Sequence, residues 1–301
     1  GRAVYGAAPL IIAAAIAIPQ GVIKPDPEAI FETESPYHYI QVVEKNGTRY
    51  LKLNEGWAVH SAYNPDRELT DSYWDYFLVG PWFGAGGTPE RVLNIGSAAG
   101  TMAGQFARYY PDTAIDGVEL DPDVVEAGRD FFAMDYPNLT VHVADGRPFL
   151  ETSRESWDFI AIDAYRQPYI PFYLTTQEFF QAASNHLNEG GAVMINVAHT
   201  PGDEALVEAI GATMRSVFPS VWQIRAGSFN KLLVATREPS TPEAVYSRLS
   251  RMPAAVAALA EELEPRTSEV TADGEILTDD RAPVEWLTDQ MIINYATGES
   301  G

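Results

Sequence analysis

The sequence contains no cysteine. Disulfide bonds, thiolate metal sites and cysteine nucleophiles are therefore excluded, although this absence does not indicate a cellular compartment. Basic residues are also scarce, because 20 Lys and Arg stand against 42 Asp and Glu, for a formal net charge of −22. Such a charge repels nucleic-acid backbones and anionic lipids. We expect no nucleic-acid partner. A cationic substrate is compatible with this charge, and so is a generic acidic surface.

Long apolar runs are missing as well. The most apolar stretch, residues 7–18, is shorter than the roughly 20 residues that cross a bilayer. It also lacks the full layout of a signal peptide. Two interpretations stay open: the end of a transmembrane helix whose beginning is absent, or a packed helix or strand. We expect a cytoplasmic location, with membrane tethering of a longer protein as the alternative.

The composition is 46% hydrophobic and 11% aromatic, which suffices for a folded core. Alternating residues on both sides of Asn46-Gly47 predict a β-hairpin. We divide the chain into four regions. Residues 1–22 are an apolar stub, and residues 23–85 are an N-terminal β-hairpin region. Residues 86–240 form a Rossmann-like nucleoside-binding catalytic domain, and residues 241–301 form a C-terminal helix and tail packing on the core.

Strand and helix patterns alternate through the third of these regions. Strands are predicted at 91–95, 114–118, 139–143, 158–162 and 192–197, and helices at 101–110, 122–133, 176–187 and 203–217. This alternation predicts an α/β fold with a parallel, doubly wound sheet. Two further runs, 221–225 and 231–236, predict a closing antiparallel hairpin.

Gly96 and Gly100 follow the first of these strands and permit a tight turn into a helix. Glu119 ends the second strand, about 20 residues further on. Glycines after a strand let the backbone approach a ligand, and a following acidic side chain can bind ribose hydroxyls. The pattern indicates a nucleoside-binding unit. An ordinary strand–helix–strand crossover with glycines is the alternative.

Acidic residues stand at the ends of three strands: Glu119, Asp145 and Asp163. Ligands of open α/β sheets bind beyond the carboxyl ends of the strands, so these side chains should converge on one crevice. Geometry then suggests that Glu119 accepts from ribose hydroxyls and Asp145 from the adenine amine. Asp163 would lie at the reactive end of the cofactor. Each could instead be a helix cap or a solvated turn.

The chain resembles the spermidine synthase (polyamine aminopropyltransferase) family, a branch of the class I methyltransferase fold. The matching pieces are Ser35-Pro36-Tyr37, Gly96–Gly100, Val118-Glu119-Leu120-Asp121, Asp145-Gly146 and Ile162-Asp163. Three further stretches, at 72–77, 174–180 and 278–285, are closest to a branch in which such a domain follows membrane helices. The resemblance covers residues 35–290.

The resemblance implies transfer of an aminopropyl group from decarboxylated S-adenosylmethionine to an amine, without a metal. Asp163 matches the family's general base, and Tyr73 matches a tyrosine that orients the amine. The implied cofactor-binding residues are Gly96, Gly100, Glu119, Asp145, Gly146 and His38. The resemblance also suggests a homodimer.

The chain departs from the family pattern at several positions. Ala99 replaces an aspartate that receives the ammonium of the aminopropyl arm, which leaves intact S-adenosylmethionine possible as the cofactor. Arg166 replaces a second aspartate and would repel a diamine. Either it selects an acceptor with a carboxylate or phosphate, or it points to solvent or pairs with an acid such as Glu178. His38 and His60 replace two glutamines.

His60 is expected in the substrate site, where it either titrates near neutrality or is a hydrogen-bonded structural residue. Tyr165 and Arg166 begin an aromatic segment, 165–173, that we interpret as a lid whose rings contact an amine. A packed loop held rigid by its two prolines is the alternative. Three functions stay open: an aminopropyltransferase, a methyltransferase using S-adenosylmethionine, and a non-catalytic sensor of a nucleoside or polyamine. We favour the first.

Overall fold

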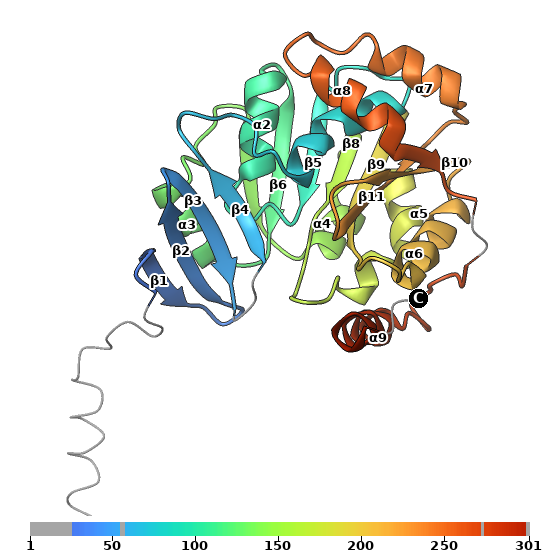
Figure 1. Cartoon of the computed structure of the whole chain (residues 1–301). Helices are drawn as coiled ribbons and strands as arrows, with labels where there is room; N and C mark the ends of the chain where they lie inside the picture. Colours follow the sequence, from blue (N-terminus) through green and yellow to red (C-terminus); the bar gives the residue numbers. More distant parts are fainter. Residues whose placement is uncertain (1–25, 55–57, 272–273, 299–301) are drawn as a thin grey trace, which may run out of the picture.

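The computed structural model describes residues 26–54, 58–271 and 274–298. Two β-sheets organise this part of the chain, a small one near the N-terminus and a large central one (Figure 1). The apolar run at 7–18 lies outside the described residues, so both interpretations of it stay predictions. Within the described ranges, no helix has the length and apolar character needed to cross a membrane.

The small sheet has four antiparallel strands in chain order: β1 (Ala29–Glu34), β2 (Tyr39–Lys45), β3 (Thr48–Leu53) and β4 (Val59–Tyr63). The predicted hairpin is β2–β3. Its turn residues Asn46 and Gly47 have φ of 53° and 77°, as a two-residue hairpin turn requires. The sheet is therefore larger than the hairpin that we predicted, because β1 and β4 extend it on both sides.

The central sheet has eight strands in the order β12-β10-β11-β9-β8-β5-β6-β7. The five strands from β9 to β7 are parallel, and the hairpin β10–β11 closes the sheet antiparallel to β9. The strands are β5 (Arg91–Ile95), β6 (Ala114–Glu119), β7 (Leu139–Val143), β8 (Trp157–Ile162), β9 (Leu187–Ala198), β10 (Ser220–Arg225), β11 (Asn230–Thr236) and β12 (Thr267–Glu269).

Helices cover both faces of the central sheet (Figure 1). Val92 packs with α2 (Thr101–Tyr109), α7 (Pro242–Leu249) and α8 (Ala257–Leu263) on one face. Its neighbour Leu93 packs on the other face with α5 (Gln177–Asn185) and α6 (Ala205–Arg215). Because both faces are buried, the inner strands β5, β8 and β9 are mostly apolar. The predicted α/β fold class is confirmed.

The remaining helical segments join these layers. The 3-10 stretch η1 (Tyr73–Phe83) is buried at ten of its eleven residues, so its aromatics do not form the one-sided stripe of a surface helix. The others are α3 (Pro122–Phe131), α4 (Gly146–Thr152), η2 (Phe172–Leu174), η3 (Glu264–Arg266) and α9 (Val284–Thr297). Between α3 and the small sheet lies a separate apolar cluster that includes Ile40 and Val124.

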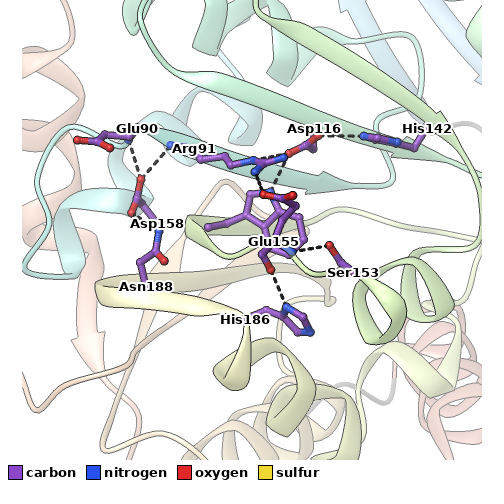
Figure 2. A network of polar contacts seen from close by, with 10 residues as sticks. Glu90, Arg91, Asp116, His142, Ser153, Glu155, Asp158, His186 and Asn188 are labelled. Carbon is purple, nitrogen blue, oxygen red and sulfur yellow. Dashed lines mark hydrogen bonds and ion pairs between the residues drawn. The ribbon is translucent and has the colours of Figure 1, made fainter.

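A polar network links side chains of four neighbouring parallel strands (Figure 2). Asp116 of β6 accepts hydrogen bonds from Arg91, His142 and Trp157, each at 2.9 Å. Asp158 accepts from the backbone N–H groups of Glu90 and Arg91. These contacts tie β5, β6, β7 and β8 together, and thereby fix the strand ends that carry the site.

Candidate active site

A cavity of about 910 Å³ lies beyond the carboxyl ends of the parallel strands. Ile95 and Glu119 end β5 and β6, and Asp163 directly follows β8. Of the eleven residues that the sequence analysis assigned to the site, nine line this cavity: His38, His60, Gly96, Glu119, Asp145, Gly146, Asp163, Tyr165 and Arg166. The three strand-end carboxylates therefore face one crevice, as the parallel topology predicts.

Asp163 is held by three neutral donors. Its Oδ2 accepts from the Tyr73 hydroxyl at 3.1 Å and from Trp74 Nε1 at 3.0 Å, and its Oδ1 accepts from Asn196 Nδ2 at 2.9 Å. Burial raises the pKa of Asp163 to about 6, and the three hydrogen bonds oppose this shift. The carboxylate is thus ionised at neutral pH, yet more basic than an exposed aspartate.

Tyr73 lies behind Asp163 and is not among the residues that line the cavity. Burial raises the pKa of its phenol well above the ordinary value, and the neighbouring Asp163 raises it further. The phenol therefore stays protonated and donates to the carboxylate. In this structure Tyr73 is placed to orient Asp163, and its predicted role in orienting an amine stays a prediction.

Glu119 is anchored by the backbone of the two loops beside it. Its Oε2 accepts from Ala98 N at 2.9 Å and its Oε1 from Asp121 N at 3.0 Å. Burial raises its pKa, and these backbone hydrogen bonds counteract the rise. Gly96, with φ of 84°, lets the chain turn here, since a Cβ would lie 2.4 Å from the carbonyl oxygen of Asp163.

Asp145 combines the two roles that the sequence left as alternatives. It is the N-cap of α4, where its Oδ1 accepts from Arg147 N at 3.1 Å. Its Oδ2 accepts from the Tyr173 hydroxyl at 2.9 Å. The residue also lines the cavity. A capping aspartate is therefore compatible with a ligand contact, because each carboxylate oxygen can accept more than one hydrogen bond.

The two histidines differ in their surroundings. His38 Nδ1 lies 3.0 Å from Asp121 Oδ2, which also accepts from Ser35 Oγ at 2.5 Å. Burial lowers the pKa of His60 to about 4, so the possibility of titration near neutrality was wrong. A hydrogen bond with the Gln167 side chain opposes this shift, so the interpretation as a hydrogen-bonded structural histidine stays open.

The segment 165–173 contributes much of the cavity wall. The Tyr165 hydroxyl donates to Asn196 O at 3.0 Å and accepts from Ala198 N at 2.8 Å. Its ring lines the cavity, but its hydroxyl is occupied by the backbone of β9. Six further residues of this segment also line the cavity: Arg166, Gln167, Tyr169, Pro171, Phe172 and Tyr173.

Arg166 is exposed and lines the cavity. In the parts of the chain that the structure describes, its guanidinium makes no ion pair. The suggested pair with Glu178 is not formed, because Glu178 accepts from the backbone N–H of Asp279 instead. Arg166 therefore places a positive charge, uncompensated by a salt bridge, at the wall formed by segment 165–173.

Gly100 does not belong to this cavity. It is the N-cap of α2 with φ of 88°, and a Cβ there would lie 2.5 Å from Met134 Cγ. It lines a second, smaller cavity on the other side of the turn. The prediction that Gly100 contacts the cofactor gains no support from this position, since its glycine is explained by the helix cap and by Met134.

Trp74, Asn196 and Glu285 were not assigned to the site from the sequence, and Tyr173 was included only as part of the predicted lid. Trp74 and Asn196 hold Asp163, and Tyr173 holds Asp145. Glu285, the second residue of α9, brings a fourth carboxylate to the cavity. A polar residue within an apolar strand could have indicated Asn196, and the matched stretch 278–285 contains Glu285, but neither signal specifies a partner.

Comparison with known proteins identifies the family. A family model of the spermine/spermidine synthase domain matches residues 83–226. A probable polyamine aminopropyl transferase of Bifidobacterium longum is 30% identical over 301 residues, which cover 90% of this chain and 65% of the relative. The polyamine aminopropyltransferase of Vibrio vulnificus is 30% identical over 277 residues, which cover 86% of this chain and 91% of the relative. This chain belongs to the polyamine aminopropyltransferase family.

The fold agrees with this membership. The crystal structure of a probable spermidine synthase from Corynebacterium glutamicum matches with a TM-score of 0.61 and 20% identity, over 85% of this chain and 99% of that chain. The family resemblance inferred from the sequence is confirmed, and the relatives are named as transferases. The branch fused to membrane helices and the homodimer stay predictions. The chain spans 65% of the length of the Bifidobacterium relative.

Proposed function

We propose that this protein is an aminopropyltransferase that uses decarboxylated S-adenosylmethionine and an amine acceptor. The observation that carries the proposal is the environment of Asp163. This carboxylate shares a cavity with Glu119 and Asp145, is held by three neutral donors, and has a pKa of about 6. A base with this pKa accepts protons near neutral pH, where a general base is most effective.

The nucleoside part of the cofactor would lie along the ends of β6 and β7. Glu119 would accept hydrogen bonds from the ribose hydroxyls, and Asp145 from the exocyclic amine of adenine. Both carboxylates are already fixed by backbone N–H groups, so they need little reordering when the ligand binds. His38, which directly precedes β2, lines the same cavity and would also contact the cofactor.

The proposed reaction needs only orientation and a proton acceptor. A neutral amine nitrogen attacks the propyl carbon bonded to the sulfonium sulfur, and a C–N bond forms as the C–S bond breaks. The electron pair stays on sulfur, which leaves neutral methylthioadenosine. The amine proton passes to Asp163. Because the sulfonium is a good leaving group, positioning of the amine supplies much of the rate enhancement.

The acceptor end of the cavity carries charges of both signs. Arg166 has no ion pair within the described residues, and Glu285 enters from α9. A diamine would meet a guanidinium there, and Coulomb repulsion would disfavour it. We therefore propose an acceptor that carries an acidic group in addition to its amine. Tyr165 and His60, which is neutral at pH 7, complete this end.

A methyltransferase that uses intact S-adenosylmethionine is the second candidate. Ala99 is 1% exposed and packs in the apolar cluster between α3 and the small sheet, so no carboxylate meets an aminopropyl ammonium at this position. Arg166 could instead receive the carboxylate of S-adenosylmethionine. These two features favour the intact cofactor, whereas the family membership favours the decarboxylated one.

The products distinguish the candidates. The protein is incubated with either cofactor and a panel of diamines and amino acids, and the nucleoside product is identified by mass spectrometry. Aminopropyl transfer yields methylthioadenosine, and methyl transfer yields S-adenosylhomocysteine. Asp163→Asn should reduce either turnover by about 10²-fold or more while cofactor binding, measured calorimetrically, persists. Binding without any product would support the sensor, and absence of binding would reject both enzymes.

A further inference from the structure

A second cavity of about 240 Å³ lies between the small sheet and α2. Aromatic side chains come to it from separate elements: Tyr50 of β3, Tyr63 of β4, and Phe132 and Tyr136 after α3. A Cβ at position 104 would lie 2.5 Å from the Tyr136 hydroxyl oxygen, so Gly104 of α2 leaves the space that this phenol occupies. The volume exceeds the roughly 30 Å³ of one water several times.

A buried acidic side chain adjoins this cavity through Gln105. Asp75 of η1 is 3% exposed and accepts four hydrogen bonds, from Thr70 N, Thr70 Oγ1, Asp71 N and Gln105 Nε2, at 2.5–2.9 Å. Each of the four partner groups can donate to an Asp75 oxygen. The described residues give it no cationic partner. Its field is therefore compensated by neutral dipoles alone.

Gln105 connects this charge to the cavity that it lines. Its amide nitrogen donates to Asp75 Oδ1 at 2.5 Å. Oε1 has no hydrogen-bond partner among the described residues, although Gln105 is only 4% exposed. A buried acceptor without a donor is costly, and a neighbouring carboxylate polarises the amide toward stronger acceptance.

The two arginines that line the cavity are neutralised by adjacent acids. Arg67 pairs with Asp71, and Arg108 pairs with Glu68. Both arginines are more than half exposed, so they lie toward solvent. An anion bound at their guanidiniums would have to displace these carboxylates, and it would leave the Gln105 acceptor unsatisfied.

We propose that this cavity binds a small organic ammonium ion. An alkylammonium supplies what the cavity lacks, namely a positive charge beside the field of Asp75 and N–H donors for Gln105 Oε1. The tyrosines Tyr50, Tyr63 and Tyr136 supply aromatic surface, to which cations are attracted electrostatically. A metal ion fits less well, because among the described residues no three acidic or histidine side chains are grouped to hold one.

The site is separate from the proposed active site. Gly96 and Ala98 line the large cavity, whereas Ala99, Gly100 and Thr101 line the small one. The turn between β5 and α2 therefore forms a wall between them. Thr101 Oγ1 bonds both the carbonyl and the N–H of Ala62, at 2.9 and 2.8 Å, which fixes this wall against β4.

The test is a calorimetric titration of the full chain with propylammonium chloride, with methylthioadenosine present to occupy the nucleoside site. We expect saturable binding that weakens at least about fivefold in Tyr63→Leu and is retained in Tyr63→Phe, because only the second variant keeps an aromatic ring. Tyr136→Leu provides the same comparison from another element, should Tyr63→Leu fold poorly. Tyr169→Leu, in the large cavity, should leave this binding unchanged.

Three results would overturn the proposal: equal binding by Tyr63→Leu and Tyr136→Leu, loss of binding in Tyr169→Leu, or equal binding of neutral propanol. Sodium sulfate is titrated in parallel. Sulfate binding that Tyr63→Leu abolishes would instead assign the cavity to anions. Melting temperatures of all variants establish that each is folded. The result is independent of catalysis, so failure here and failure of the proposed aminopropyl transfer can be told apart.

Discussion

Trp74 Nε1 lies 3.0 Å from Oδ2 of Asp163, the same oxygen to which the Tyr73 hydroxyl donates. Two adjacent residues of η1 thus hold the same oxygen of Asp163, which directly follows β8. Asp163 lies 90 residues after Tyr73 and 89 residues after Trp74. Asn196 Nδ2 holds the other oxygen from β9. The carboxylate is therefore fixed in orientation from two sides, while its lone pairs remain available toward the cavity.

This arrangement predicts the pH dependence of turnover. Asp163 must be ionised to accept a proton, so kcat should rise with pH through the pKa of about 6 and fall below it. Trp74→Phe removes one hydrogen-bond donor to the ionised carboxylate, which raises the pKa of Asp163. The rising limb of the kcat–pH profile should therefore move to higher pH by up to about one unit. The measurement is kcat against pH for the wild type and the variant.

Trp82→Phe is the matched control, because Trp82 donates to the Tyr110 hydroxyl and not to Asp163. Its limb should coincide with that of the wild type. A purely structural role of Trp74 would lower kcat uniformly without shifting the limb, and that outcome would contradict the hydrogen-bond argument.

Glu119 is predicted to be needed for cofactor affinity. In Glu119→Gln, the amide nitrogen must face either Ala98 N–H or Asp121 N–H, both of which donate to the carboxylate. We expect the Kd for decarboxylated S-adenosylmethionine to rise about tenfold or more, which corresponds to about 1.4 kcal/mol. Glu126→Gln, on the exposed surface of α3, is the control that should leave the Kd unchanged. Wild-type affinity in Glu119→Gln would exclude a ribose contact.

Parallel topology made the centre of this site predictable. Carboxyl ends of parallel strands share an edge, so Glu119, Asp145 and Asp163 could be grouped from spacing alone. Trp74 and Asn196 could not, because their contacts depend on packing between segments that no local pattern relates. Gly100, which was predicted to contact the cofactor, lines the smaller cavity instead, and its predicted role stays a prediction. Which side of a turn a residue faces is decided by its tertiary neighbours, here Met134.

Burial was the second quantity that the sequence did not reveal. His60 stands in the alternating strand β4 and is half-buried, as such a strand predicts, and an ordinary pKa would be expected there. Its surroundings lower the pKa to about 4, chiefly by desolvation. The size of the small sheet was also underestimated, because β1 and β4 lack the turn signal that marks β2–β3.

Arg166→Asp tests the proposed exclusion of diamines. Reversing the charge should lower the KM for putrescine by about tenfold at low ionic strength and change kcat little, since two exposed charges interact by about 1 kcal/mol in water. Arg154→Asp, which makes the same change in net charge away from the cavity, should have no such effect. If putrescine turnover is the same in both variants, Arg166 does not select the acceptor.

The polar network around Asp116 is predicted to stabilise the sheet that carries the site (Figure 2). Burial alone would raise the pKa of Asp116, but hydrogen bonds from Trp157, His142 and Arg91 outweigh it and lower the pKa. Asp116→Asn turns an amide N–H toward one of these donors. We expect a loss of about 3 kcal/mol in the free energy of unfolding at pH 7, measured by urea denaturation.

The pH dependence separates this loss from a packing defect. A carboxyl whose pKa is lowered on folding contributes stability above its unfolded-state pKa, and this contribution is lost as the pH falls through the folded-state value. The difference between wild type and Asp116→Asn should therefore be largest near neutrality and shrink below about pH 4.

Glu155→Gln removes another acid that pairs with Arg91, but Glu155 is 54% exposed. It should cost less than about 1 kcal/mol. Equal losses in the two variants, or a loss in Asp116→Asn that does not change with pH, would mean that the buried ion pair is not what stabilises this edge of the sheet.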